Sequence, residues 1–246
     1  MRALIFSDIH GNIEALNAVL KFAKRHRVDR YICLGDLVGY GASPNETIQK
    51  IQTLKPLTVI RGNHDKAVSG HDSIETFNPI AAAAIQWTKT RILKKNLEFL
   101  DHLPKGPLTI DDEIEICHGA PFDEDYYIFG EYDAIEAFDY LPFPLAFFGH
   151  THFPVIYTKR DDQVEGQFLS GPVNLLKIEK GFFYLINPGS VGQPRDRNPR
   201  AAFAIYDREL RQVRFHRVEY EIAEAQKKIL QAELPSALAE RLTLGL

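Results

Sequence analysis

Short apolar runs alternate with segments of helical periodicity over the first two thirds of the chain. Residues 2–8 have the pattern of a buried strand, and residues 14–26 carry apolar side chains at the spacing of one helical face. Further strands are expected at residues 30–36, 57–65, 114–120 and 145–152, and further helices at residues 45–54, 79–100 and 132–141. Strands that alternate with helices predict an α/β layered fold.

The pattern changes after residue 155. Short β-like runs are broken there by Gly, Pro, Asp and Asn, which predicts a mostly antiparallel meander that forms a second sheet. A charged helical tail is expected at about residues 222–246, and a helical insertion or cap at about residues 72–103. Because the chain contains no obvious repeat, low-complexity segment or linker, we expect a single domain over residues 1–246.

Composition narrows the range of functions. The 246 residues carry a formal net charge of -4, so we expect no polybasic surface for a long nucleic acid or an anionic membrane. No apolar stretch approaches the ~20 residues of a membrane span, and the apolar run near residue 1 is too short for a signal peptide. Cys33 and Cys117 lie in apolar runs, which is typical of core thiols in a reducing compartment. We therefore expect a cytoplasmic protein.

Polar residues follow five of the expected strands at the point where each strand ends. They are Asp8 and His10; Asp36; Asn63, His64 and Asp65; His118; and His150 and His152. Because ligands bind outside the carboxyl ends of the strands in open α/β sheets, these side chains should meet at one edge. Any one of them alone would be interpreted as a loop residue or a helix cap. The remaining histidines, His26, His71, His102 and His216, are expected on the surface.

The residue types in this set indicate metal chemistry. Imidazole and carboxylate ligands without thiolate favour borderline divalent metals such as Mn, Fe, Co, Ni or Zn. Two aspartates, an asparagine and four histidines of this set would give seven ligands, which are too many for one tetrahedral ion and suit two ions roughly 3.5 to 4 Å apart that share a carboxylate. His150 and His152 are two residues apart, so in an extended segment both would face the site.

The ordered motifs "SDIHGN", "GDLVGYG", "GNHD", "CHGAP" and "GHTH" resemble those of the calcineurin-like metallophosphoesterase superfamily. The later segment "NPGSVGQPRD" is similar to one in its small bacterial and archaeal phosphodiesterase branch. The resemblance implies a four-layer α/β/β/α sandwich of two mixed sheets flanked by helices. It also implies a site in which Asp8, His10 and His152 hold one metal, Asn63, His118 and His150 hold a second, and Asp36 bridges them.

The resemblance further implies a two-metal phosphoesterase, with manganese favoured and Fe, Ni, Co or Zn as alternatives. A metal-bridging hydroxide would attack the phosphorus atom, and His64 would assist the leaving group. Where the protein Ser/Thr phosphatases have Asp-Arg-Gly, this chain has Gly39, Tyr40 and Gly41, so their phosphate-gripping arginine is missing. Arg195 is a candidate substrate-binding residue in its place. The alternative is that Arg195 pairs with Asp196 or another surface acid.

The resemblance allows phosphodiester, phosphomonoester and dinucleoside polyphosphate substrates, and we expect a small phosphorylated substrate, such as a nucleotide. Four aromatic residues follow metal motifs and could either stack a nucleobase or pack in the loops, namely Tyr40, Phe122, Tyr126 and Tyr127. Two other functions stay open: a non-catalytic scaffold on the same fold, and a nuclease of the DNA-repair branch.

Overall fold

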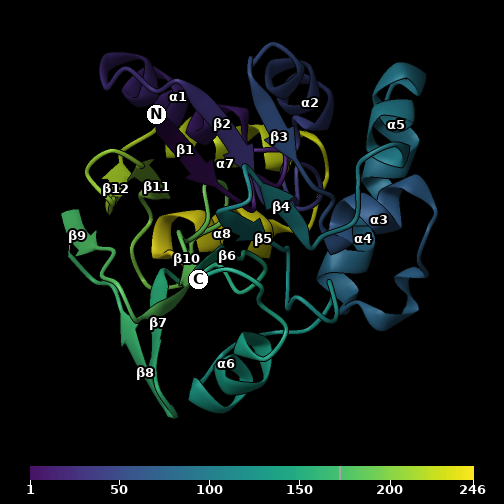
Figure 1. Ribbon diagram of the computed structural model, residues 1–246. Helices are drawn as coiled ribbons and strands as arrows, with labels where there is room; N and C mark the ends of the chain where they lie inside the picture. Colours follow the sequence, from purple (N-terminus) through teal and green to yellow (C-terminus); the bar gives the residue numbers. More distant parts are fainter. Residues whose placement is uncertain (172) are drawn as a thin grey trace.

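Two six-stranded sheets lie face to face between helices in the computed structural model, which describes residues 1–171 and 173–246 (Figure 1). The first sheet consists, in spatial order, of β3 (Leu57–Val59), β2 (Arg30–Cys33), β1 (Arg2–Phe6), β11 (Ala201–Asp207), β12 (Gln212–Val218) and β9 (Val173–Lys177). The second consists of β4 (Leu108–Ile110), β5 (Ile114–Ile116), β6 (Leu145–Phe147), β10 (Phe183–Asn187), β7 (Val155–Arg160) and β8 (Gln163–Phe168).

The helices lie outside the two sheets. They are α1 (Ile13–Arg25), α2 (Pro44–Gln52), α3 (Asn63–Ser69), α4 (Pro79–Arg91), α5 (Lys94–Asp101), α6 (Glu131–Phe138), α7 (Ile222–Gln231) and α8 (Ser236–Leu244), with a 3-10 turn at Ile74–Thr76. Figure 1 shows α6 at the bottom beside the β7–β8 hairpin, and α3, α4 and α5 grouped at the right. None of the described helices is long and apolar enough to cross a membrane.

Strand alternation explains the four layers. In β1, Leu4 and Phe6 face the core shared with α1 and α2, while Ala3 and Ile5 face the core between the two sheets. In β6, Leu145 and Phe147 face the core between the sheets, whereas Ala146 joins the core beneath α6. Both sheets are mixed, because β1 is parallel to β2 and antiparallel to β11, and β10 is parallel to β6 and antiparallel to β7. The predicted sandwich of two mixed sheets flanked by helices is confirmed.

The strands after residue 155 pair mostly antiparallel, as predicted, but the expectation that they form a sheet of their own is wrong. The strands after residue 155 divide between the sheets: β7, β8 and β10 extend the second sheet, whereas β9, β11 and β12 complete the first. The alternation of apolar residues reports that a strand is half-buried, but it does not report which partner covers it. For this reason the sequence pattern could not assign these strands to a sheet.

Three local predictions also need correction. The helix expected at residues 79–100 is two helices, and the Asn45 side chain holds the break by accepting from the Leu93 N–H at 2.9 Å and donating to the Arg91 carbonyl at 2.9 Å. The strand expected at residues 57–65 ends at Val59, and α3 begins at Asn63. His216 is buried rather than on the surface, and its ring stacks on Phe203 in the neighbouring strand.

The remaining expectations about burial agree with the structure. Cys33 and Cys117 are both buried free thiols. Ala81 and Ala84 of α4, in the helical insertion expected at about residues 72–103, share one apolar cluster with α7 and α8.

Candidate functional site

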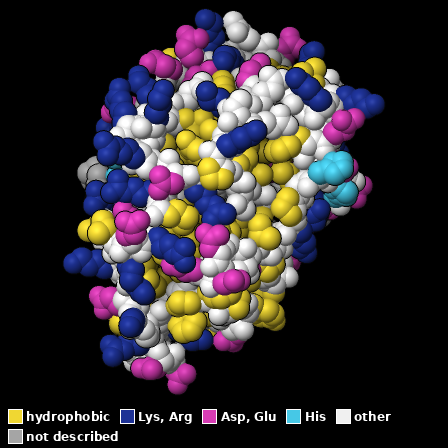
Figure 2. All heavy atoms as spheres, turned by 45° about the horizontal axis from the view of Figure 1, so that its top comes forward, with side chains coloured by type: hydrophobic (Ala, Val, Ile, Leu, Met, Phe, Trp, Pro, Cys, Tyr) yellow, Lys and Arg dark blue, Asp and Glu magenta, His cyan; other side chains and the backbone are white. Residues whose placement is uncertain are grey.

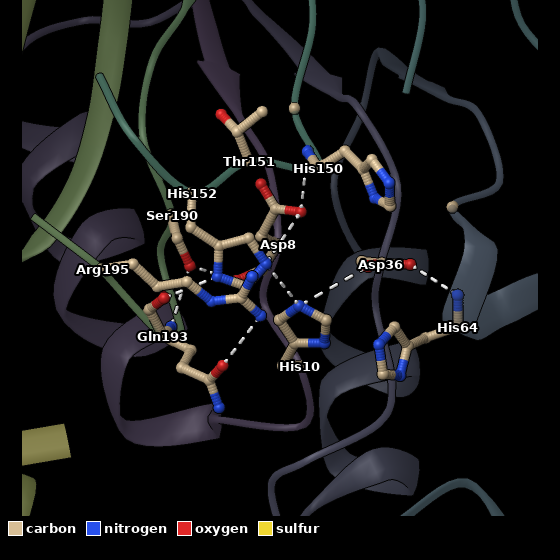
Figure 3. A network of polar contacts seen from close by, with 12 residues as sticks. Asp8, His10, Asp36, His64, His150, Thr151, His152, Ser190, Gln193 and Arg195 are labelled. Carbon is tan, nitrogen blue, oxygen red and sulfur yellow. Dashed lines mark hydrogen bonds and ion pairs between the residues drawn. The ribbon is translucent and has the colours of Figure 1, made fainter. Parts of the chain in front are cut away.

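The predicted polar residues meet where the carboxyl ends of strands from the two sheets come together (Figure 3). A single parallel bridge between Ser7 and Ser190 joins the ends of β1 and β10. The Ser190 hydroxyl donates to the Asp8 carbonyl at 2.9 Å. Gly149 lies so close to this junction that a Cβ there would come within 2.1 Å of the Ser7 hydroxyl. The two sheets therefore deliver side chains to one buried point.

Asp8, His10, Asp36 and His152 form the first half of the site. The Nε2 atoms of His10 and His152 are 3.1 Å apart. His10 Nε2 lies 3.5 Å from the Asp36 Oδ2, and His152 Nε2 lies 3.6 Å from the Asp8 Oδ1. All four side chains are buried, and the Asp8 Oδ2 has no hydrogen-bond partner among the described residues.

Asp36, His118, His150 and Asn63 form the second half. His118 Nε2 lies 3.5 Å from the same Asp36 Oδ2 and 3.1 Å from the Asn63 Oδ1. Asp36 thus lies between the two halves, where one carboxylate could contact two ions. The ring of His150 packs against that of His118, with centroids 5.0 Å apart.

The backbone fixes the tautomer of each imidazole. Each ring bonds a main-chain carbonyl through one nitrogen, and the pairs are His10 Nδ1 with Val38, His118 Nδ1 with Leu34, His150 Nε2 with Asp125 and His152 Nδ1 with Gln193, at 2.6 to 3.1 Å. Since a carbonyl only accepts, these nitrogens carry a proton. The other nitrogen of His10, His150 and His152 presents a lone pair, because burial keeps these three rings neutral. In His118 the Asp36 charge outweighs burial and raises the pKa to about 10, so its Nε2 also holds a proton, which a bound cation would displace. With that proton displaced, the inward-facing atoms are lone pairs and oxygens, a donor set that fits divalent cations.

Strained backbone accompanies the ligand positions. Asp8, His10, Asp36, His150 and His152 all have left-handed φ angles, between 50° and 67°. Such conformations cost about 1 to 3 kcal/mol each in non-glycine residues and cluster at functional sites. They also correct one expectation: β6 ends at Phe147, so His150 and His152 reach the site from a left-handed turn and not from an extended strand.

Burial controls the charges of the cluster. Burial raises the pKa of Asp8 to about 7, with a contribution from the Asp36 charge. Burial lowers the pKa values of His10, His150 and His152 well below the usual value, so these rings are neutral. Burial also acts to raise the pKa of Asp36, but the neighbouring imidazoles, His118 foremost, hold it well below its usual range. Asp36 therefore stays ionised beside a protonated His118, whereas the neutral rings of His10, His150 and His152 can bind a cation without losing a proton.

His64 lies beside the cluster without belonging to it. Its backbone N–H donates to the Asp36 Oδ1 at 2.9 Å, and its ring lies between those of Tyr40 and Phe77, with centroids 4.5 Å and 5.2 Å away. Its Nδ1 is buried without a partner among the described residues, and burial lowers its pKa to about 4.

The Asp65 carboxylate accepts from the Gly62 N–H at 3.0 Å and the Leu37 N–H at 2.9 Å, which fixes the start of α3.

Arg195 reaches the site from the segment after β10. Its Nη2 lies 3.4 Å from the Tyr40 hydroxyl and 3.2 Å from the Gln193 Oε1. The expected alternative partner, Asp196, forms its ion pair with Arg217 instead. In the described part of the chain the Arg195 guanidinium therefore hydrogen-bonds only to neutral groups, and its Nε is buried without a partner.

A cleft of about 530 Å³ opens beside His64 and the second half of the site. Of the four aromatic residues singled out, Tyr40 and Tyr127 line it. The Tyr127 ring stacks on His150 at 3.7 Å between centroids and stays 40% exposed. Phe122 and Tyr126 pack on each other instead, at 5.0 Å, and do not line the cleft.

Several residues that hold the ligands were not singled out from the sequence. The Asn187 side chain donates to the Gly149 carbonyl at 2.7 Å and to the Thr151 hydroxyl at 3.0 Å, which fixes the turn that carries His150 and His152. Gln193 positions His152 through its main-chain carbonyl. Both lie in the "NPGSVGQPRD" segment, so the resemblance of that segment was the signal that could have identified them.

A two-sheet sandwich with a buried imidazole and carboxylate cluster at its strand ends is typical of metal-dependent hydrolases. The chain belongs to the calcineurin-like phosphoesterase superfamily, whose domain model matches residues 1–210. Membership of this family indicates a phosphoric ester hydrolase.

Relatives cover the whole chain. A metallophosphoesterase from Sphaerobacter thermophilus has a similar crystal structure, with a TM-score of 0.86 and 39% identity over 100% of this chain and 99% of that one. An uncharacterized protein of Methanocaldococcus jannaschii is 42% identical over 98% of this chain and 97% of its own. A hypothetical protein of Pyrococcus horikoshii OT3 shares the fold, with a TM-score of 0.80 and 21% identity over 100% and 98% of the two chains.

Proposed function

We propose that this protein is a two-metal-dependent phosphoesterase that hydrolyses small phosphodiester or nucleotide-type substrates. The observation that carries the proposal is the convergence of four imidazole nitrogens on two positions that share the Asp36 carboxylate. In this assignment the first ion is held by Asp8, His10 and His152, the second by Asn63, His118 and His150, and Asp36 bridges them. Imidazole, carboxylate and amide ligands without thiolate favour borderline divalent metals. Among these we favour Mn²⁺ on the family resemblance, with Fe, Co, Ni and Zn as alternatives.

Two bound divalent ions would supply a water of lowered pKa as nucleophile and neutralise the oxygens of the scissile phosphate. The chain provides the remaining functions. His64 lines the cleft next to Asp36 and is placed to donate a proton or a hydrogen bond to the leaving-group oxygen. Arg195, free of any carboxylate partner in the described residues, is placed to bind nonbridging phosphate oxygens from the side of Tyr40.

The cleft and the surface charge support a small substrate. A volume of about 530 Å³ is within the range of small-molecule sites. The exposed face of Tyr127 offers a stacking surface for a nucleobase. Figure 2 shows Lys and Arg side chains scattered among Asp and Glu side chains on one face of the molecule, and the net charge is -4. Neither observation favours a long nucleic acid.

Elemental analysis and ester hydrolysis on one purified sample test the proposal. We expect close to two metals per chain and Mn²⁺-stimulated hydrolysis of bis-p-nitrophenyl phosphate, with p-nitrophenyl phosphate as the monoester comparison. Asp139→Asn is a matched control for Asp36→Asn, because the Asp139 side chain is 68% exposed and forms an ion pair with Lys159, on the side of the molecule that carries α6. A protein that hydrolyses neither ester after metal loading would contradict the proposal and favour a scaffold.

A further inference from the structure

The segment that carries Arg195 is fastened to the end of α8. The Arg197 N–H donates to the Gly245 carbonyl at 2.8 Å. Gly245 has φ of 65°, and a Cβ there would lie 2.6 Å from the Asn198 nitrogen, so the two backbones are in close contact. Leu238 and Leu242 of α8 share an apolar cluster with Tyr40 from the site. Helix α8 is thus held at the rim of the site on two sides.

This packing brings a second arginine to Arg195. Arg241 of α8 donates from Nη1 to the Gln193 Oε1 at 3.2 Å, and Arg195 donates from Nη2 to the same oxygen at 3.2 Å. Gln193 is buried, and its main-chain carbonyl bonds His152 Nδ1 at 2.6 Å. One residue therefore connects both guanidinium groups to a candidate metal ligand.

Neither of the two arginines has an acidic partner in the described part of the chain. Among residues 1–171 and 173–246, neither Arg195 nor Arg241 forms an ion pair, whereas the nearby Arg217 is paired with Asp196. Two full positive charges converge instead on one neutral amide oxygen. Burial lowers the pKa of Arg241, and the charge of Arg195 adds to this effect. An anion between the two groups would relieve the repulsion, and planar guanidinium groups match the oxygens of a phosphate.

The position of the pair relates it to the metal site. Arg195 Nη2 lies 3.4 Å from the hydroxyl of Tyr40, and the Tyr40 ring packs on that of His10, a ligand assigned to the first ion, at 4.6 Å between centroids (Figure 3). Arg241 contacts the same Gln193 side-chain oxygen from the α8 side. A phosphoryl group on the metals would therefore contact Arg195, and a group next to it in the substrate would reach both arginines.

We propose that Arg195 and Arg241 form a subsite for a second phosphoryl group, so that the enzyme prefers substrates with a phosphoanhydride or a further phosphate beside the scissile bond. This inference rests on the proposed function, since it names the substrates of the same site. It assigns Arg241, in a tail that the sequence pattern marked only as charged and helical, to substrate binding.

Calorimetric titration with two non-hydrolysable ligands tests the subsite without turnover. The ligands are the methylene-bridged analogue of ADP and the phosphonate analogue of AMP, which share base and sugar and differ by one phosphoryl group. We expect the wild type to bind the ADP analogue at least roughly tenfold more tightly, and Arg241→Gln to weaken that binding roughly 10- to 100-fold, with a much smaller effect on the AMP analogue. The affinity of Arg241→Lys for the ADP analogue should fall between those of the wild type and Arg241→Gln, because lysine keeps the charge but lacks the planar, bidentate donor group of arginine.

Lys227→Gln is the matched control, since it removes one positive charge from α7 at a surface position. It should leave both affinities unchanged, and circular dichroism should show that every variant is folded. An equal loss for both ligands in Arg241→Gln, or no loss for the ADP analogue, would overturn the inference. The titration is repeated on metal-free protein, where the preference should persist, so that failure of the metal-dependent reaction and failure of the subsite give different results.

Discussion

The imidazole of His64 lies directly against Gly39, and a Cβ at position 39 would come within 2.3 Å of the His64 Nδ1. Gly39 has φ of 87°, in the turn that follows Asp36. The ring is confined on its other sides by Tyr40 and Phe77. The place of His64 beside the cleft is therefore set by the absence of a side chain at residue 39.

Gly39→Ala should displace the His64 ring and lower kcat/KM for bis-p-nitrophenyl phosphate roughly 100-fold, because a shift of about 1 Å in a catalytic group has effects of this size. The metal content should not change. Gly70→Ala is the matched control: Gly70 has φ of 90°, but no atom lies within 4 Å of its Cβ position. Both variants should lose stability, by about 1 to 2 kcal/mol, and equal activities in the two variants would contradict the placement of His64.

Asp36→Asn and His64→Ala should separate metal binding from turnover. Asp36 contacts both halves of the site, so its amide variant should lose metal and activity together. His64→Ala should keep close to two ions per chain, while kcat falls roughly 10²- to 10³-fold, the range expected for loss of one hydrogen-bond donor to the transition state. Metal analysis and kinetics on the same preparations check this, and loss of metal from His64→Ala would show that its assigned role is wrong.

Tyr127→Leu should weaken the recognition of a nucleoside. Stacking of a base on an aromatic ring contributes about 1 to 3 kcal/mol, so kcat/KM for thymidine 5′-p-nitrophenyl phosphate should fall roughly 5- to 150-fold relative to methyl p-nitrophenyl phosphate. The two esters share a leaving group and differ in the nucleoside. Tyr132→Leu is the control, because Tyr132 is 90% exposed on α6. A parallel fall for both esters would indicate that Tyr127 only supports His150.

His216 should make the free energy of unfolding depend on pH. Burial lowers its pKa from 6.5 to about 4, with contributions from His26 and Arg214. Between these pH values the unfolded chain binds a proton that the folded chain does not, so the stability present above pH 6.5 falls as the pH decreases toward 4, by up to about 3 kcal/mol. In urea titrations from pH 4 to 7, His216→Phe should lack this part of the decrease. A constant difference between the variant and the wild type would refute it.

The meeting of the polar residues could be predicted because it depends on a general property of parallel strands. Asp8 and Asp36 follow β1 and β2, whose ends lie at one edge in any α/β sheet. The prediction for His150 and His152 gave the correct direction for the wrong reason, because their left-handed backbone was not visible in the letters "GHTH". The metal roles themselves stay a prediction until ions are measured.

Contacts between distant segments were beyond the sequence pattern. Arg241 meets Gln193 only because α8 folds back over the site, and nothing in the local periodicity of α8 indicates that contact. His216 lies in a strand rich in charged residues, which suggested the surface, but its position on β12 places it against Phe203. Helix and strand patterns report local burial, whereas these contacts depend on which elements pack together.

The position of β1 between β2 and β11 has a consequence for protein synthesis. Asp8 and His10 emerge early from the ribosome. Strand β11 (Ala201–Asp207) covers the second edge of β1, and it is synthesised on the order of ten seconds or more later. During that time the edge of β1 is open to pairing with other chains, a hazard for aggregation. Gln193 and Ser190, which hold His152 and Asp8, also emerge late. Nascent chains should therefore acquire metal only near the end of translation. In a heterologous host, co-expression of chaperones should increase the yield of folded protein, because it protects the open edge of β1 while the rest of the chain is made.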